Sequence, residues 1–161
     1  TKKEVKVQVS NMEMFTDYSL KKISIPADLV NPYKDYSAIS LNVYKEDYAP
    51  FAKGVYTSTF FGDEWEQVLE YSPMLDTYRF SDLYVSEYDF FFTWDGGSTM
   101  TLKTTDTATG YVHPSYGMVT ARAVATLYDP STDTMKFQYN WIVSAGSFGA
   151  YIESFVITER Y

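Results

Sequence analysis

The sequence offers one imidazole, and its surroundings do not predict a catalytic base. His113 lies in Tyr111-Val112-His113-Pro114-Ser115-Tyr116-Gly117, a segment predicted to be a loop. A Ser-His-Asp arrangement would need a serine folded against this ring. The G-x-S-x-G elbow of serine hydrolases is missing, because Gly146-Ser147-Phe148-Gly149 has a different spacing. A surface position is therefore the simpler interpretation of His113.

Glu64 and Glu66 form the carboxylate pair with the best spacing for acid–base hydrolysis. Residues i and i+2 of a strand share a face and lie about 7 Å apart. The two acids of a glycosidase are roughly 5–10 Å apart. The solvated face of an amphipathic strand explains the same pair more simply, so a hydrolase ranks below the other hypotheses.

Metal and cofactor chemistry find little support in the residue types. The chain has no cysteine and one histidine, which excludes disulfides, thiolate ligands and a His-rich zinc site. Asp129-Pro130-Ser131-Thr132-Asp133 carries oxygen ligands suited to calcium. It lacks the twelve-residue pattern of a calcium loop, and a turn capped by aspartates explains it equally well. We expect no enzyme activity, cofactor or metal.

Aromatic residues are the most informative set, at 16 Tyr, 11 Phe and 3 Trp. An exposed aromatic ring is a flat platform for the apolar face of a sugar, and loops on a rigid scaffold often carry such sites. Trp65, Trp94 and Trp141 lie on strand-like segments, where core packing is the simpler interpretation. The candidate ligand-binding residues are Tyr84 and Tyr88 beside Asp82 and Glu87; Trp94; Tyr111, His113 and Tyr116; and Phe148 and Tyr151 near Gly146 and Gly149.

Charge limits the choice of partner. The chain has 13 Lys+Arg against 21 Asp+Glu, a net charge of −8. Nucleic-acid binding requires a basic footprint, so it is not expected. An acidic surface rich in tyrosine suits a neutral polyol. The sequence holds no apolar run near the ~18–20 residues of a transmembrane helix, so no transmembrane segment is predicted.

Two units must position these residues. Residues 1–53 have 8 Lys and 7 Asp+Glu, whereas residues 54–161 have 5 Lys+Arg and 14 Asp+Glu. The seam is the segment 48–54, punctuated by Pro50 and Gly54. We predict a small β segment over 1–50, which either packs against the following domain or is the end of a sandwich that continues upstream, and a β-barrel-like domain over 51–161. Period-2 alternation predicts three strands in the first unit: Glu4–Ser10, Leu20–Pro26 and Ala38–Tyr44.

The second unit is predicted to be an antiparallel meander. Short alternating segments separated by turn residues are typical of a sandwich or a barrel. Asp95-Gly96-Gly97 is the strongest hairpin signal. We therefore expect an all-β fold, barrel-like or sandwich, whose eight strands are Val55–Phe61, Glu64–Tyr71, Thr77–Phe80, Tyr88–Trp94, Ser98–Thr104, Met118–Tyr128, Thr134–Ser144 and Tyr151–Glu159.

Residues 54–161 also resemble a known class of protein. Gly54-Val55-Tyr56-Thr57-Ser58 with Gly62-Asp63-Glu64-Trp65, the turn Leu127 to Thr132, and the closing segments 143–151 and 153–155 resemble β-domains of Bacteroidetes surface lipoproteins of the polysaccharide-utilisation type. The resemblance implies an immunoglobulin-like unit, of which residues 1–50 would be an incomplete part, followed by a lipocalin-like or barrel-like domain. It implies a lipidated cysteine upstream of Thr1, a cell-surface or periplasmic location at the outer membrane, and outer-membrane protein partners.

Three hypotheses of function follow from these patterns. The leading one is a non-enzymatic module that binds a polysaccharide or oligosaccharide, or supports a glycan-uptake complex. The second is a lipocalin-like barrel around a small apolar ligand, since an eight-strand barrel can enclose one. Its cavity would be lined by two faces: Tyr88, Phe90, Phe92 and Trp94, and Phe137, Tyr139 and Trp141. The third is a structural or adhesin spacer.

Overall fold

The computed structural model describes the backbone of residues 21–26 and 38–43, and residues 46–161 in full. The chain divides into two compact units, Thr1–Asp47 and Tyr48–Tyr161. In the first unit, β1 (Lys21–Pro26) pairs antiparallel with β2 (Ala38–Val43), with Ile23 opposite Leu41. Both strands were expected from the alternation of Ile, Leu and Val. The strand expected over Glu4–Ser10 lies outside the described residues.

The second unit is a single curled antiparallel sheet, and the prediction of an all-β, barrel-like meander is confirmed. Its order is β7-β6-β5-β4-β3-β11-β10-β9-β8, so the first and last strands of the unit pair at the centre. The strands are β3 (Ala49–Ser58), β4 (Asp63–Ser72), β5 (Thr77–Phe80), β6 (Phe90–Trp94), β7 (Met100–Leu102), β8 (Asp106–His113), β9 (Gly117–Asp129), β10 (Thr134–Val143) and β11 (Gly146–Arg160).

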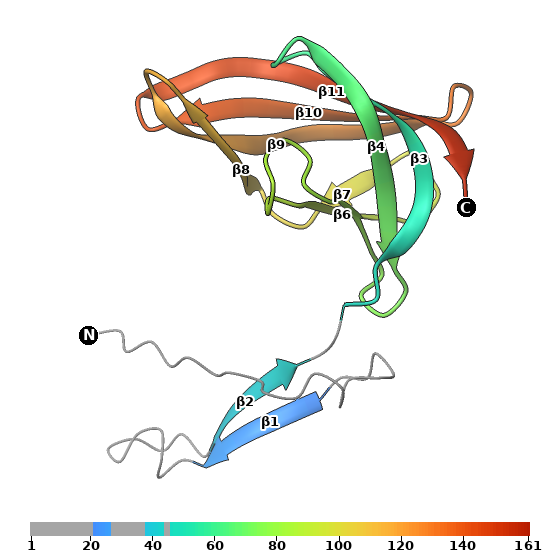
Figure 1. Cartoon of the computed structure of the whole chain (residues 1–161), viewed down its shortest axis with the longest axis vertical. Helices are drawn as coiled ribbons and strands as arrows, with labels where there is room; N and C mark the ends of the chain where they lie inside the picture. Colours follow the sequence, from blue (N-terminus) through green and yellow to red (C-terminus); the bar gives the residue numbers. More distant parts are fainter. Residues whose placement is uncertain (1–20, 27–37, 44–45) are drawn as a thin grey trace. The chain divides into compact units, whose positions relative to one another are not determined.

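The curl of the sheet brings its two ends together. In Figure 1, β9, β10 and β11 run side by side. The strands β3 and β4 curve away from them, so that β6 and β7 lie on the opposite side of the curled sheet. The amide of Tyr128 on β9 donates to the carbonyl of Ser98 just before β7, at 2.8 Å. The amide of Met100 on β7 donates to the hydroxyl of Thr126 on β9 at 3.3 Å. The described residues contain no helix long and apolar enough to cross a membrane.

Aromatic side chains fill the inner face. On β10 the alternation of the sequence predicts one shared face for five residues, and all five are buried: Met135, Phe137, Tyr139, Trp141 and Val143. Rings from opposite walls meet: Phe92 lies 5.3 Å from Phe137 and Phe90 lies 5.7 Å from Tyr139, measured between ring centroids. The burial of each of these large apolar side chains contributes roughly 1.5–3 kcal/mol to the stability of the folded state. These contacts join the two walls of the curled sheet.

One strand changes face at a bulge, which corrects an expectation. The alternation over 118–128 predicts Val119 and Leu127 on the same face. Val119 is buried, but Leu127 is 48% exposed and Tyr128 is buried instead. The register between β9 and β10 shifts by one residue, because Gln138 pairs with Ala125 whereas Tyr139 pairs with Ala123. The extra residue, Val124, moves every later side chain to the opposite face.

The ninth strand, β8, was not expected. It covers Asp106–His113, where threonine, alanine and glycine replace the alternating large apolar residues. Gly110 adopts φ +72°, and the β8–β9 register shifts between Ala108 and Val112. The bulge favours glycine at position 110, because glycine adopts a positive φ without strain. Glycine also interrupts the alternation of apolar residues that would have predicted the strand.

Candidate functional site

The structure separates the predicted ligand-binding residues into different places. Tyr84 and Tyr111 line one hollow, and Trp94 lines another. Tyr111, His113 and Phe148 lie on strands β8 and β11, not in loops as expected, and Tyr151 lies on β11. Tyr88 packs against Gly110, where an added Cβ would lie 2.4 Å from its Cδ2 atom. Sequence spacing could not show these placements, since they depend on how the sheet curls.

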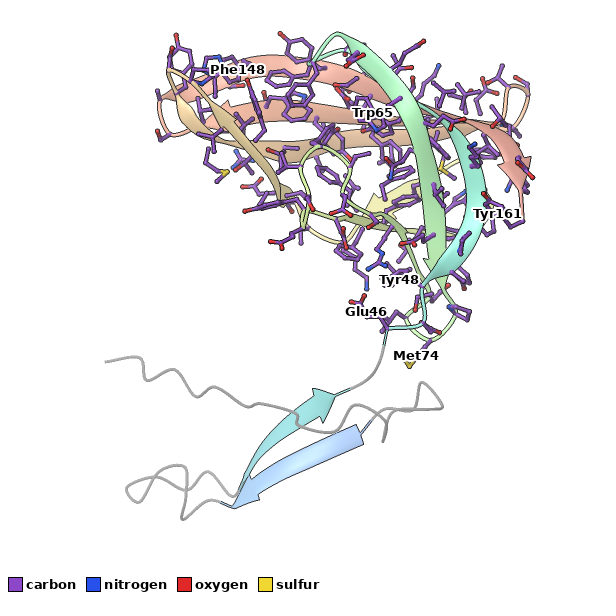
Figure 2. The ribbon with its side chains drawn as sticks, in the orientation of Figure 1. Glu46, Tyr48, Trp65, Met74, Phe148 and Tyr161 are labelled. Carbon is purple, nitrogen blue, oxygen red and sulfur yellow. The ribbon has the colours of Figure 1, made fainter. Side chains whose placement is uncertain are left out.

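The first hollow, called here the aromatic hollow, has a volume of about 290 Å³ and is lined by Phe61, Asp63, Trp65, Tyr84 and Tyr111. Phe61 and Tyr111 are 5.0 Å apart with planes at 84°, and Trp65 and Tyr84 are 6.1 Å apart at 74°. Figure 2 marks Trp65 on β4. The sequence reasoning missed Phe61, Asp63 and Trp65 as lining residues.

A buried carboxylate supports the wall of the aromatic hollow. Glu153 on β11 has no exposed surface. The Tyr84 hydroxyl donates to Glu153 Oε2 at 3.4 Å, and the Phe60 amide donates to Oε1 at 3.4 Å. The Tyr56 hydroxyl lies 2.7 Å from that of Tyr84. Burial raises the pKa of Glu153 to about 7, and burial also raises the pKa of both tyrosines.

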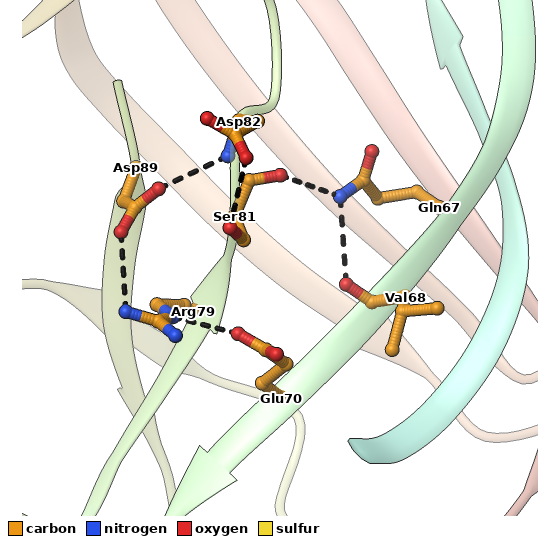
Figure 3. Close-up of polar contacts among 7 residues, drawn as sticks. All are labelled: Gln67, Val68, Glu70, Arg79, Ser81, Asp82 and Asp89. Atoms are coloured by element: carbon orange, nitrogen blue, oxygen red, sulfur yellow. Dashed lines mark hydrogen bonds and ion pairs between the residues drawn. The ribbon is translucent and has the colours of Figure 1, made fainter. Parts of the chain in front are cut away.

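A polar network holds the segment that carries Tyr84. Figure 3 shows Arg79 between Glu70 and Asp89, with N–O distances of 2.7 and 3.3 Å. The Gln67 side chain joins two walls of the hollow, because its amide oxygen accepts from the Trp65 indole at 3.2 Å and its amide nitrogen donates to the Ser81 carbonyl at 2.9 Å. The rings are therefore positioned before any ligand arrives.

Three other predicted residues form a cluster beside the aromatic hollow. His113 lies 4.9 Å from Tyr116 and 5.2 Å from Phe148, measured between ring centroids. Figure 2 marks Phe148 near the start of β11. His113 Nδ1 accepts from the Ser115 amide at 3.1 Å, so this nitrogen is used by its own turn. Tyr116 and Phe148 line a small hollow of about 230 Å³ with the β10–β11 turn.

The second large hollow, called here the polar hollow, has a volume of about 400 Å³. Its lining combines one indole with two carboxylates and three hydroxyls: Trp94, Asp76, Asp95, Thr93, Thr99 and Thr101. The Trp94 indole N–H donates to the Gly97 carbonyl at 2.7 Å, and its ring packs 4.7 Å from Tyr128. The Tyr71 hydroxyl donates to Asp76 at 2.9 Å. These contacts fix the orientation of the indole and of one carboxylate.

The carboxylates considered for hydrolysis and calcium have structural partners. Glu64 and Glu66 are exposed on β4, and Glu66 pairs with Lys53 at 2.9 Å. The Ser131 amide donates to Asp129 at 3.0 Å, as expected for a capped turn, and Asp133 accepts from the Tyr128 hydroxyl at 2.7 Å. No group of three histidine or carboxylate side chains able to hold a metal occurs among the residues that the structure describes.

Comparisons with protein-family models, with curated proteins and with solved structures each find no match to this chain.

Proposed function

We propose that this protein is a non-enzymatic module that binds a neutral glycan in the polar hollow. The observation that carries the proposal is the set of residues that line that hollow: Trp94, Asp76, Asp95 and three threonines. A sugar ring has an apolar face that suits an aromatic plane and hydroxyls that need hydrogen-bond partners. The volume of about 400 Å³ falls in the range of small-molecule sites, about 300–1,000 Å³.

The cellular setting is part of the same proposal. The resemblance of residues 54–161 to Bacteroidetes surface lipoproteins favours a cell-surface or periplasmic location, with a lipid anchor upstream of Thr1 and an outer-membrane partner for glycan uptake. The net charge of −8 is consistent with a neutral ligand rather than a polyanion, because a polyanion would be repelled.

The alternative of an apolar ligand inside the barrel is less well supported. Its cavity would lie between the aromatic face of β6 and that of β10. Phe92 contacts Phe137 and Phe90 contacts Tyr139 across this space, and all four rings are buried. The rings therefore occupy the space that the ligand would need.

The test is a screen of the full chain on immobilised plant, host and microbial polysaccharides, followed by titration of each hit. Asp95→Asn and Thr101→Val alter polar groups of the hollow and leave Trp94 in place. Each is expected to weaken binding about 2–12-fold, the value of one hydrogen bond. Thr57→Val on β3 is the control and should bind as the wild type does. A flat screen, or equal affinity in all variants, would contradict the proposal and favour the spacer hypothesis.

A further inference from the structure

The aromatic hollow has a different chemistry from the polar hollow. Four of its lining residues are aromatic, from the β3–β4 turn, β4, the β5–β6 segment and β8. Two pairs of neighbouring rings stand nearly perpendicular, at 84° and 74°. Phe61 and Tyr84 add a third pair, 5.4 Å apart. The hollow is therefore lined by aromatic rings from four separate segments of the chain, and two pairs of neighbouring rings pack edge to face.

The polar atoms of two of these rings are already used within the protein. The Trp65 indole N–H donates to Gln67, and the Tyr84 hydroxyl donates to Glu153 while lying 2.7 Å from the Tyr56 hydroxyl. A sugar placed in this hollow would find few partners for its hydroxyls. A ligand that needs ring surface and no hydrogen bonds fits better.

The one charged group in the lining is a carboxylate. Asp63 is exposed and accepts from the Glu64 amide at 2.8 Å. Within the described part of the chain it has no basic partner, whereas Lys53, Arg79, Arg122 and Arg160 are each paired with other carboxylates. Residues 54–161 have 5 basic and 14 acidic residues, a net charge of −9. The hollow is therefore placed to attract a cation.

We propose that the aromatic hollow binds the trimethylammonium group of a small soluble compound such as choline. A quaternary ammonium spreads its charge over methyl groups, donates no hydrogen bond, and is attracted to the faces of aromatic rings. Asp63 supplies the opposite charge at the opening. A primary ammonium fits less well, because it would give up its hydrogen bonds to water for ring faces that accept them poorly. The site is separate from the polar hollow and does not depend on the glycan proposal.

The test is a titration of the full chain with choline, with tetramethylammonium, and with dimethylbutanol, the neutral carbon isostere of choline. Heteronuclear NMR of the tryptophan indole N–H signals reports where each compound binds. The two cations are expected to shift the Trp65 signal and to bind at least about tenfold more tightly than the isostere. Phosphatidylcholine vesicles form a further arm, and binding to vesicles in place of free choline would overturn the assignment to a soluble compound.

Two pairs of variants separate charge from ring surface. Asp63→Asn keeps the acceptor for the Glu64 amide and is expected to weaken choline binding about fivefold at low salt, and less at high salt. Its control is Asp129→Asn, since Asp129 lies outside both hollows and accepts from the Ser131 amide of its turn at 3.0 Å. Tyr111→Leu keeps apolar bulk and loses the ring, so about a tenfold weakening is expected. Its control is Tyr116→Leu, a change at an exposed tyrosine outside the hollow.

Three results would overturn the proposal. The first is equal affinity for choline and its neutral isostere, which would indicate a merely apolar hollow. The second is a loss of choline binding in the Asp129 or Tyr116 control variant that is as large as the loss in its matched variant. The third is no binding of either cation at millimolar concentration. None of these outcomes affects the glycan proposal, which is tested by other ligands and other residues.

Discussion

Replacing the buried Glu153 by glutamine should change how the stability of the protein depends on pH. Glu153 is fully buried on β11 beside Tyr84, Tyr56 and Tyr139. Because burial disfavours the charged form, the pKa of this carboxyl rises from 4.5 in its ordinary state to about 7 in the folded protein. Between these values the folded state keeps a proton that the unfolded state has released.

The sign and the size follow from proton linkage. Where the folded state binds more protons, the free energy of unfolding falls as pH rises. The loss begins near pH 4.5 and is complete above a pH of about 7. The difference of about 2.5 pKa units, at about 1.36 kcal/mol each, gives roughly 3 kcal/mol. Glu153→Gln lacks the titrating group, so its stability relative to the wild type should rise by roughly this amount between acidic and alkaline pH.

Urea unfolding followed by tryptophan fluorescence, from about pH 5 to about pH 8.5, measures this difference. Glu159→Gln changes an exposed glutamate on the same strand and should follow the wild-type profile. Parallel pH profiles for the wild type and Glu153→Gln would refute the reasoning. They would mean that the carboxyl is hydrated or fully compensated in the folded protein.

Other perturbations test the fold itself. Gly110→Ala meets the Tyr88 ring at a positive φ, whereas Gly62→Ala has a similar φ and open space. By urea unfolding, the Gly110 variant should be less stable than the Gly62 variant by about 1–3 kcal/mol. Leu127→Ala should change stability by less than about 0.5 kcal/mol, and Tyr128→Ala should lower it by about 3 kcal/mol; the reverse order would place the bulge elsewhere. Arg79→Met should speed amide hydrogen exchange over residues 81–89, and unchanged exchange would show that other contacts hold this segment.

The alternation of apolar residues predicted most of the sheet because it reports directly which face is buried. The strand Thr77–Phe80 appears with the expected bounds, and the inward face of β10 is as expected. The pattern failed where the strand geometry is irregular. At Val124 a bulge reverses the faces, and in β8 a glycine and several threonines replace the apolar residues. Neither feature has a period that a sequence pattern can detect.

The candidate sites were less predictable than the strands. Phe61 and Tyr111 are fifty positions apart in the sequence, and they meet because the curled sheet brings β8 near the β3–β4 turn. Tyr88, one of the candidate ligand-binding residues, packs its ring against Gly110, which is 22 positions away in the sequence. Composition drew attention to aromatic residues, and such residues line both hollows. Which of them line a hollow depends on long-range pairing, and no local pattern encodes that.

The most direct test of the account is one NMR experiment on the three indole N–H signals of the full chain. The glycan identified by the screen should shift the Trp94 signal, choline should shift the Trp65 signal, and the buried Trp141 signal should stay in place with both. This result would establish two separate sites with the chemistry proposed for each. A glycan that moves Trp65 and leaves Trp94 unchanged would contradict the central claim that the polar hollow is the glycan site.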